Sequence, residues 1–230
     1  MFLMRAFLNP DSPAVRSDLA SPESLHKTVM RAFPDLHGPT ARQDLAILHR
    51  LDHVQDGRLV LLVQSLRQPD PTRWPAGYVA DVAADADFAF SHADNPEVRD
   101  VAKERSVIAT GQRYRFRLKA NTTKRLSAKS PNVTPDRVGM RVPVHGDDAR
   151  KQWLARRASA AGFNVELDAV RTTEVPAAGG ASGKHVTVAG TLFEGVLVVV
   201  DHERFHVALQ HGIGPAKAYG YGLLSIATAR

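Results

Sequence analysis

The sequence predicts an α+β protein of two tandem domains, each with the order strand, helix, strand, strand, helix, strand. A length of 230 residues suits one large domain or two small ones. Charge changes sign near residue 105, since residues 113–157 hold 13 Lys and Arg against three Asp, whereas residues 81–104 hold seven acids against two bases. The element order of the second half also recurs weakly in the first. We therefore expect domains at residues 1–95 and 106–230.

The elements of the first half follow from apolar runs and turn residues. Residues 2–8 are short and apolar, which predicts an opening strand. Ser21 is suited to cap a helix over residues 22–33, with Pro22 at its first position and Glu23 at the positive end of its dipole. Strands are expected at 45–51 and 59–66 around the Asp56-Gly57 turn. A final strand at 86–91 and a linker at 92–96 complete this unit.

The second half shows clearer patterns. Strict alternation over Tyr114–Leu118 predicts a strand with arginines along one side. Asp147 or Asp148 is expected to cap a helix that ends at Gly162. Strands follow at 163–175 and 185–200, joined by a glycine-rich connection at 179–183. Asp201 caps a helix to about residue 210, and residues 222–228 form the last strand. This order is the ferredoxin-like motif in tandem, an RRM-like fold that also serves as a single-stranded RNA-binding sheet.

Composition excludes several classes of mechanism. The chain has no Cys, so it has no disulfide, no thiolate nucleophile and no cysteine-ligated zinc or iron–sulfur site. The longest apolar stretch, Val196–Val200, is far shorter than the ~20 residues of a membrane span. The first eight residues include Arg5 and no cleavage signal follows them. We predict a cytoplasmic protein with no membrane partner.

The basic stretch predicts a nucleic-acid partner. Aromatic and cationic residues alternate at its start, and the prolines and glycine that follow suggest a hairpin long enough to leave the sheet. Lys and Arg on such an arm neutralise phosphates; a solvated basic face is the plainer alternative. The candidate RNA-binding cations are Lys119, Lys124, Arg125, Lys129, Arg137, Arg141, Arg156 and Arg157.

A glycine-rich segment at residues 211–222 precedes the last strand. It matches neither the P-loop nor the dinucleotide-binding pattern, and it does not join a strand to a helix. Glycines there let the backbone approach a phosphate chain or a partner helix closely, although a helix cap followed by a tight turn would also explain the first two. The candidates for RNA contact are Gly212, Gly214, Lys217 and Gly220.

Histidines offer two candidate sites. The segment His202–His206 reads H-E-x-x-H, the zinc-protease signature, but residues 207–230 contain no Asp or Glu to complete a ligand set, so an exposed helix face is the favoured interpretation. His49 and His53 share that spacing in an apparent strand. His26 lies at the edge of the apolar face of its helix, where it can reach a cleft and act as a general acid or base. A merely packed or solvated histidine is the alternative.

Four segments of the sequence form a further pattern: Tyr114–Arg125 (YRFRLKANTTKR), Trp153–Arg157 (WLARR), Phe193–Leu197 (FEGVL) and Gly212–Ser225 (GIGPAKAYGYGLLS). In this order and spacing they resemble the CasE family, also called Cse3, the CRISPR repeat endoribonucleases of type I-E systems. The segment Leu25–Pro34 is similar to the family's N-terminal helix, which places the family's catalytic histidine on His26. The resemblance implies two ferredoxin-like domains that face each other across a groove.

The resemblance also implies a reaction. It is metal-independent, cofactor-free cleavage of a stem-loop in CRISPR precursor RNA, by in-line attack of the 2′-hydroxyl, leaving a 2′,3′-cyclic phosphate and a 5′-hydroxyl. The implied partners are the repeat hairpin, as precursor and as mature guide RNA, and the other Cascade subunits. A non-catalytic subunit that binds the hairpin is the alternative.

One position departs from the family pattern. Members often carry a tyrosine three residues before the histidine, where this chain has Glu23. The carboxylate either orients His26 or points away as an ordinary acid at a helix N-terminus, and we favour the latter. Another hydroxyl, such as that of Ser24, supplies the function of the missing phenol, or that function is dispensable.

Overall fold

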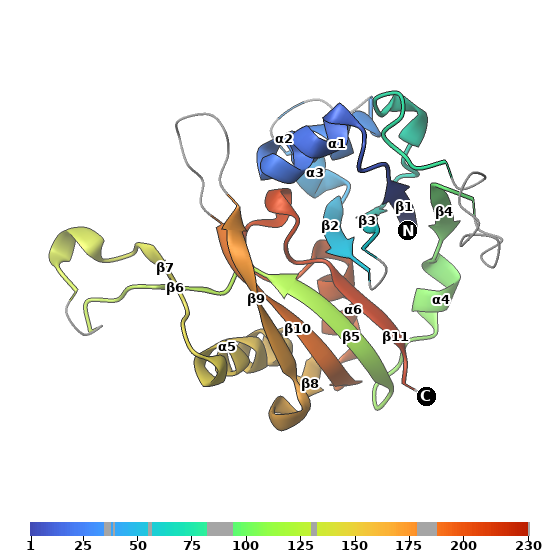
Figure 1. Ribbon diagram of the computed structural model, residues 1–230. Coiled ribbons are helices and arrows are strands. Elements are labelled where there is room, and N and C mark those ends of the chain that lie inside the picture. The colour runs from blue at the N-terminus through green and yellow to red at the C-terminus, as the bar shows by residue number, and fades with distance from the viewer. Residues whose placement is uncertain are drawn as a thin grey trace.

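The computed structural model describes residues 1–34, 38, 40–54, 57–81, 94–129, 133–178 and 188–229. In this part of the chain, two larger sheets form two domains, and a small two-stranded sheet projects from the second domain (Figure 1). No helix among these residues is long and apolar enough to cross a membrane. The strand orders given below confirm two tandem ferredoxin-like domains.

The first domain is built on an antiparallel sheet with the order β2-β3-β1-β4. Helix α2 buries Leu25, Thr28 and Val29, and its apolar residues join those of the sheet in one core. Its elements are β1 (Phe2–Leu8), α1 (Pro13–Ala20), α2 (Pro22–Arg31), α3 (Ala41–Asp44), β2 (Leu48–His53), β3 (Leu59–Ser65), the 3₁₀ turn η1 (Pro71–Arg73) and β4 (Glu97–Asp100).

Some expectations for the first domain need correction. Strand β2 begins at Leu48 instead of residue 45, because the short helix α3 and the left-handed Ala46, with a φ of 48°, come before it. Helix α1 was not expected. The strand predicted at 86–91 lies outside the described residues, as do Asp56 of the predicted turn and residues 92–93 of the linker.

Strand β4 lies in the stretch that the sequence left between the two expected domains, yet it pairs with β1 of the first sheet. The predicted linker covers residues 92–96 and so ends just before this strand, in which Glu97, Arg99 and Asp100 are charged. Two ion pairs hold these charges at the sheet edge: Arg5 contacts Glu97 at 2.8 Å, and the amino terminus contacts Asp100 at 3.2 Å.

The second domain repeats the arrangement with an insertion. Its sheet has the order β11-β5-β10-β8, and β9 also pairs with β10. Helices α5 and α6 pack on one face of the sheet and bury Trp153, Leu154, Phe205 and Leu209 (Figure 1). The elements are α4 (Ala102–Ser106), β5 (Arg113–Ala120), β6 (Thr123–Arg125), η4 (Pro135–Arg137), β7 (Arg141–Pro143), α5 (Asp147–Ala160), β8 (Phe163–Val165), η5 (Leu167–Ala169), β9 (Arg171–Ala178), β10 (Val188–Val199), α6 (His202–His211), η6 (Lys217–Tyr219) and β11 (Leu224–Thr228).

Two details of this domain differ from the sequence prediction. Helix α5 has Gly146 at its N-cap, with a φ of 85°, because the Asp147 carboxylate instead accepts a hydrogen bond from Thr172 and pairs with Lys151. The single strand expected at 163–175 is two strands separated by η5, and each pairs with a different part of β10. The predicted cap of α6 is confirmed, since the Asp201 side chain accepts from the Arg204 N–H at 3.1 Å.

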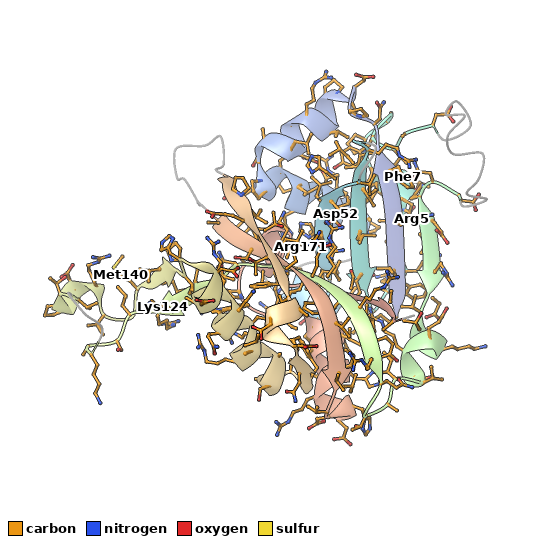
Figure 2. The ribbon with its side chains drawn as sticks, turned by 60° about the horizontal axis from the view of Figure 1, so that its bottom comes forward. Arg5, Phe7, Asp52, Lys124, Met140 and Arg171 are labelled. Carbon is orange, nitrogen blue, oxygen red and sulfur yellow. The ribbon has the colours of Figure 1, made fainter. Side chains whose placement is uncertain are left out.

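Strands β6 and β7 form the arm, which we define as residues 123–143 in their described part. It extends away from both domains, and Lys124 and Met140 lie along it in Figure 2. The Trp153 indole of α5 donates to the Thr123 carbonyl at 3.0 Å and so fixes the base of the arm. The prediction of a hairpin that leaves the sheet is confirmed.

A buried arginine joins the two domains. Arg50 on β2 is 2% exposed, and its Nη1 donates to the carbonyls of Arg117 and Leu223 in the second domain, both at 3.2 Å. Its Nε donates to both carboxylate oxygens of Asp52, at 2.9 and 3.0 Å. The guanidinium of the first domain therefore donates hydrogen bonds to two backbone carbonyls of the second domain. Its charge is neutralised by Asp52 of the first domain.

We expect Arg50→Met to lower the free energy of unfolding by about 3–5 kcal/mol, because the buried Asp52 carboxylate then keeps only its longer contact with Arg117, at 3.9 Å. Urea denaturation at pH 7 measures this. Arg99→Met is the matched control, since Arg99 is exposed and its pair with Glu104 is worth about 0–1 kcal/mol. Equal losses in the two variants would show that Arg50 does not hold the domains together.

Candidate active site

His26 lies on α2, half-buried at the edge of the apolar face, as the sequence predicted. The helix begins as expected, with Pro22 in its first turn and the Ser21 side chain accepting from the Ser24 N–H at 3.3 Å. Leu25 and Val29 point into the core on either side of this position. Packing therefore fixes the histidine, while part of its ring stays accessible.

A second histidine lies against His26. The rings of His26 and His49 are stacked, with centroids 6.2 Å apart and planes 23° from parallel. His49 on β2 is fully buried, and neither of its ring nitrogens has a hydrogen-bond partner among the described residues. The Nδ1 of His26 is also buried and without a partner there. The sequence drew attention to His49 only for its spacing from His53.

Both imidazoles are held in the neutral form. Burial lowers the pKa of His26, and the positive charge of Arg42 lowers it further. Burial lowers the pKa of His49 to about 3, and the charges of Lys119 and Arg42, with that of His26 when it is protonated, act in the same direction. At neutral pH His26 is therefore an unprotonated base beside a cationic surface.

The glycine-rich segment packs onto the first domain at this point. Its turn η6 contacts both α2 and β2. A Cβ at Gly212 would lie 2.9 Å from a methyl carbon of Leu48, and a Cβ at Gly220 would lie 3.5 Å from the His49 ring. Both glycines also have positive φ, of 74° and 81°. The close approach that the sequence indicated is thus an approach to the chain's own first domain, and Gly212 additionally ends α6.

Gly214 and two cations lie on the second-domain side of this junction. A Cβ at Gly214 would lie 3.2 Å from the Trp153 ring, over which the Arg157 guanidinium stands at 5.4 Å. Burial lowers the pKa of Lys217, and the charges of Arg42 and Arg157 lower it further. The structure thus brings Lys217 near the helix of His26, together with Arg42, which the sequence reasoning missed, while Arg157 lies on the far side of Lys217 beside Trp153.

The other predicted cations lie in two different places. Lys119 is half-buried on β5, where its Nζ is 5.1 Å from the centre of the Tyr221 ring and burial lowers its pKa. It therefore belongs to the domain junction instead of the arm. The remaining candidates are exposed on the arm or on α5: Lys124, Arg125, Lys129, Arg137, Arg141 and Arg156.

The hydroxyl suggested as a substitute for the missing tyrosine is already engaged. Ser24 Oγ donates to one carboxylate oxygen of Asp18 at 2.6 Å, and Tyr78 donates to the other at 2.7 Å. Ser24 therefore supports the start of α2. Glu23 lies in the first turn of that helix, partly exposed.

The H-E-x-x-H segment opens α6, with the rings of His202 and His206 6.5 Å apart and nearly perpendicular. Among the residues that the structure describes, no group of three His, Asp or Glu side chains could hold a metal ion.

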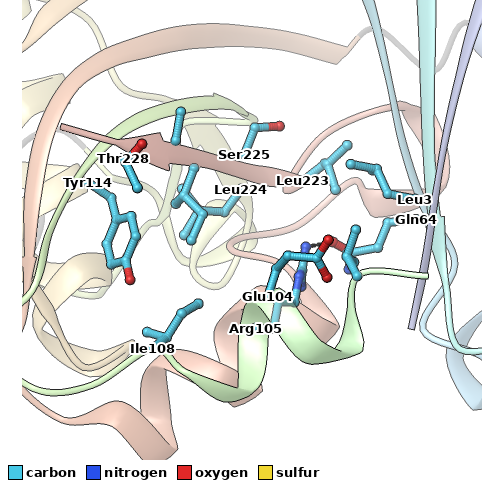
Figure 3. A pocket seen from close by; sticks show the side chains of 13 residues that line it. Leu3, Gln64, Glu104, Arg105, Ile108, Tyr114, Leu223, Leu224, Ser225 and Thr228 are labelled. Atoms are coloured by element: carbon cyan, nitrogen blue, oxygen red, sulfur yellow. Dashed lines mark hydrogen bonds between the residues drawn. The ribbon is translucent and has the colours of Figure 1, made fainter. Parts of the chain in front are cut away.

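Another set of contacts closes the domain junction away from His26. Gln64 Nε2 donates to the carbonyl of Leu209 at 2.8 Å, and its Oε1 accepts from Arg105 at 2.7 Å. Burial lowers the pKa of Arg105 to about 10. A mostly apolar pocket of about 250 Å³ lies beside these side chains (Figure 3). It shares no lining residue with the cationic surface around Arg42 and Lys217.

The fold and site define a class of protein. It has two ferredoxin-like domains that meet beside a histidine, and a basic arm extends from the second domain. Comparison with known proteins then gives the family. Residues 1–228 match the family model described as CRISPR associated protein, so the chain belongs to that family. A CRISPR-associated endoribonuclease Cse3 of Thermus thermophilus is 34% identical over 99% of this chain and all of its own length. The Cascade subunit CasE of Escherichia coli is 33% identical over 88% of this chain and 90% of its own.

Solved structures agree with this placement. A Cse3 endoribonuclease bound to a 19-nucleotide RNA matches with a TM-score of 0.74 and 33% identity, covering 98% of each chain. The Thermus thermophilus Cse3 bound to an RNA that represents a pre-cleavage complex matches with a TM-score of 0.75 and 32% identity over the same share of each chain. The resemblance to the CasE family is therefore confirmed.

The buried His49 predicts an acid-sensitive fold. In the unfolded chain its pKa is about 6.5, so below that pH the unfolded state binds one proton more and stability falls by about 1.4 kcal/mol per pH unit. Between pH 7 and pH 5 this contribution is about 2 kcal/mol. We expect His49→Phe to lose correspondingly less stability than the wild type over that range, as measured by urea denaturation. His53→Phe, which removes an exposed histidine from the same strand, keeps the wild-type response if this explanation is correct.

Proposed function

We propose that this chain is an RNA-binding endoribonuclease that cleaves CRISPR precursor RNA at a repeat stem-loop and stays bound to the mature guide RNA. The observation that carries the proposal is the position of His26. It is held neutral at the junction of the two domains, beside the cations Arg42 and Lys217. The endoribonuclease names of the relatives, and their structures with RNA, support the same activity.

The proposed reaction uses a nucleophile of the RNA. The 2′-hydroxyl oxygen bonds to the adjacent phosphorus as the bond from phosphorus to the 5′-oxygen breaks. One proton leaves the 2′-hydroxyl and one reaches the 5′-oxygen, which yields a 2′,3′-cyclic phosphate and a 5′-hydroxyl. This chemistry requires neither a metal nor a protein nucleophile. Neutral His26 is suited to move the protons, a role that contributes about 10²–10⁴-fold to a rate.

The exposed cations are proposed to hold the hairpin. A protein reads A-form RNA chiefly by its shape, its backbone and its unpaired ends, because side chains cannot enter the deep major groove. The arm carries Lys124, Arg125 and Lys129 where they can follow a phosphate chain, and Arg156 and Arg157 on α5 extend the basic surface.

Membership of a larger assembly follows from the same relationship. The Escherichia coli relative is named as a subunit of Cascade. We propose that this chain keeps the processed guide RNA within such a complex and contacts its other subunits.

His26→Ala should lower the single-turnover cleavage rate of a repeat hairpin by about 10²–10⁴-fold, because it removes the proton-transfer group. Affinity for the hairpin should remain within about twofold, since a neutral imidazole adds no phosphate charge contact. Gel-based cleavage in excess EDTA and fluorescence anisotropy measure the two quantities. His202→Ala is the matched control and should leave both unchanged.

A hairpin with a 2′-deoxy nucleotide before the cut completes this experiment. Binding without cleavage of that RNA supports attack by the 2′-hydroxyl, whereas cleavage of it would require a water nucleophile and contradict the mechanism. If the wild type binds the unmodified hairpin and never cuts it, the chain is a hairpin-binding subunit instead.

The arm predicts a strong salt dependence of RNA binding. Reversing Lys124, Arg125 and Lys129 to Glu should weaken binding and reduce the log–log salt slope by about 2, because each lost phosphate contact removes about 0.7–0.9. Anisotropy titrations from low to high salt measure the slope. Reversing Arg16, Arg73 and Lys103, which are exposed elsewhere, changes net charge equally and should leave most of the slope. Equal slopes in the two variants would show that the arm cations merely face solvent.

A further inference from the structure

A pocket between α3 and the glycine-rich segment is not used by the reaction proposed above. It has a volume of about 360 Å³, and we call it the junction pocket because both domains line it. Arg42 and Gln43 come from the first domain, and Lys217 and His211 come from the second. Ala46 and residues 214–216 complete the wall, and no Asp or Glu is among the lining residues.

The charges of the junction pocket are uncompensated within it. Arg42 and Lys217 are each half-buried, and burial lowers the pKa of both. The Arg42 Nη1 donates to the Ile47 carbonyl at 3.1 Å, which fixes the side chain without neutralising it. Holding like charges together and partly desolvated is unfavourable, and an anion with several acceptor oxygens removes that cost.

The backbone of the pocket wall is strained. Ala216 has a φ of 62°, a left-handed conformation that costs a non-glycine residue free energy, and it is followed by the tight turn η6. The Tyr219 N–H donates to the Ala216 carbonyl at 2.9 Å and closes that turn. Strained backbone of this kind persists where the surroundings hold it, and it is concentrated at binding sites. Here it precedes Lys217, which lines the pocket together with Arg42.

The junction pocket lies next to His26 but does not include it. The charge of Arg42 lowers the pKa of His26, and η6, which begins at Lys217, packs against the helix of that histidine. His26 itself is not a lining residue. A group bound in the pocket would therefore lie close to His26 without belonging to the same site.

We propose that the junction pocket binds a phosphate adjacent in the RNA chain to the scissile one, with Arg42 and Lys217 as its ligands. This inference rests on the proposed function and names a contact that fixes which linkage reaches His26. Because one ligand comes from each domain, the contact forms only when the domains are docked as observed. Arg42 is then a positioning residue for the cleavage.

The test pairs protein variants with modified RNA. A hairpin made uncleavable by a 2′-deoxy nucleotide before the cut carries one neutral methylphosphonate, placed at either phosphate that flanks the scissile one or at a distant stem phosphate. Dissociation constants of wild type, Arg42→Gln and Lys217→Gln are measured by anisotropy. Arg31→Gln is the matched control, because Arg31 is an exposed arginine at the end of α2.

In the wild type, neutralising one of the two flanking phosphates should weaken binding about tenfold, the loss typical of a hydrogen-bonded ion pair. Arg42→Gln and Lys217→Gln should each weaken binding of unmodified RNA similarly, and the same methylphosphonate should then cost them less than about twofold. Arg31→Gln should respond as the wild type does, and the distant methylphosphonate should affect all proteins equally.

The proposal would be overturned if, in both variants, the methylphosphonate at either flanking position weakened binding as much as it does in the wild type. It would also be overturned if the substitutions reduced only the effect of the methylphosphonate at the distant stem phosphate. Agreement between Arg42→Gln and Lys217→Gln excludes a local folding defect in either. The readout is binding to an uncleavable RNA, so it stays informative if the wild type proves unable to cleave. Conversely, cleavage of unmodified hairpin without this coupling would leave the proposed function intact and remove only the pocket's role.

Discussion

The position of the buried Arg50 guanidinium between the two domains is the constraint on which the site depends. Asp52 neutralises it from its own strand, and two backbone carbonyls of the second domain accept from it. One of them belongs to Leu223, directly after the glycine-rich segment. The residue before Arg50 is His49, so the same contact holds that histidine beneath Gly220. Without this docking, His26 and the cations of the second domain would belong to separate surfaces.

The electrostatics of the docked site favour a polyanion. The charge of Arg42 on α3 lowers the pKa of Lys217 on η6 across the junction, and it also disfavours protonation of His26. His49 beneath it, with a pKa of about 3, stays neutral at neutral pH, so the positive charge of the site comes from Arg42 and Lys217. The free protein therefore holds partly desolvated positive charge that an RNA backbone would compensate. In such a site, binding of the substrate itself removes the free energy cost of holding partly desolvated positive charges together.

Local signals in the sequence predicted the elements well, and long-range packing explains what they missed. The side chains of Ser21 and Asp201 cap their helices as expected, because a cap is decided within one turn. Strand β4 escaped prediction because its pairing partner β1 is about a hundred residues away. His49 and Arg42 escaped for the same reason, since nothing near either residue in the sequence indicates that the glycine-rich segment will cover it. The helix pattern singled out His26 and the family resemblance agreed with it, whereas the surroundings of His26 could be seen only in the docked domains.

Under the proposed function, the second domain supplies most of the contacts that bind the RNA, and the first domain supplies the residue that acts in cleavage. The arm and α5 belong to the second domain and carry the exposed cations proposed to hold the hairpin, whereas His26 comes from the first. Attack by the RNA's own hydroxyl breaks one covalent bond and leaves the phosphates of the stem in place. The contacts that bind the precursor therefore also bind the product. Contacts that are equally strong to both do not change the rate of the chemical step and are not lost when it occurs. Retention of the guide RNA then needs no additional binding site. It follows because the basic surface contacts the stem, whereas the histidine acts only on one linkage at the edge of the stem.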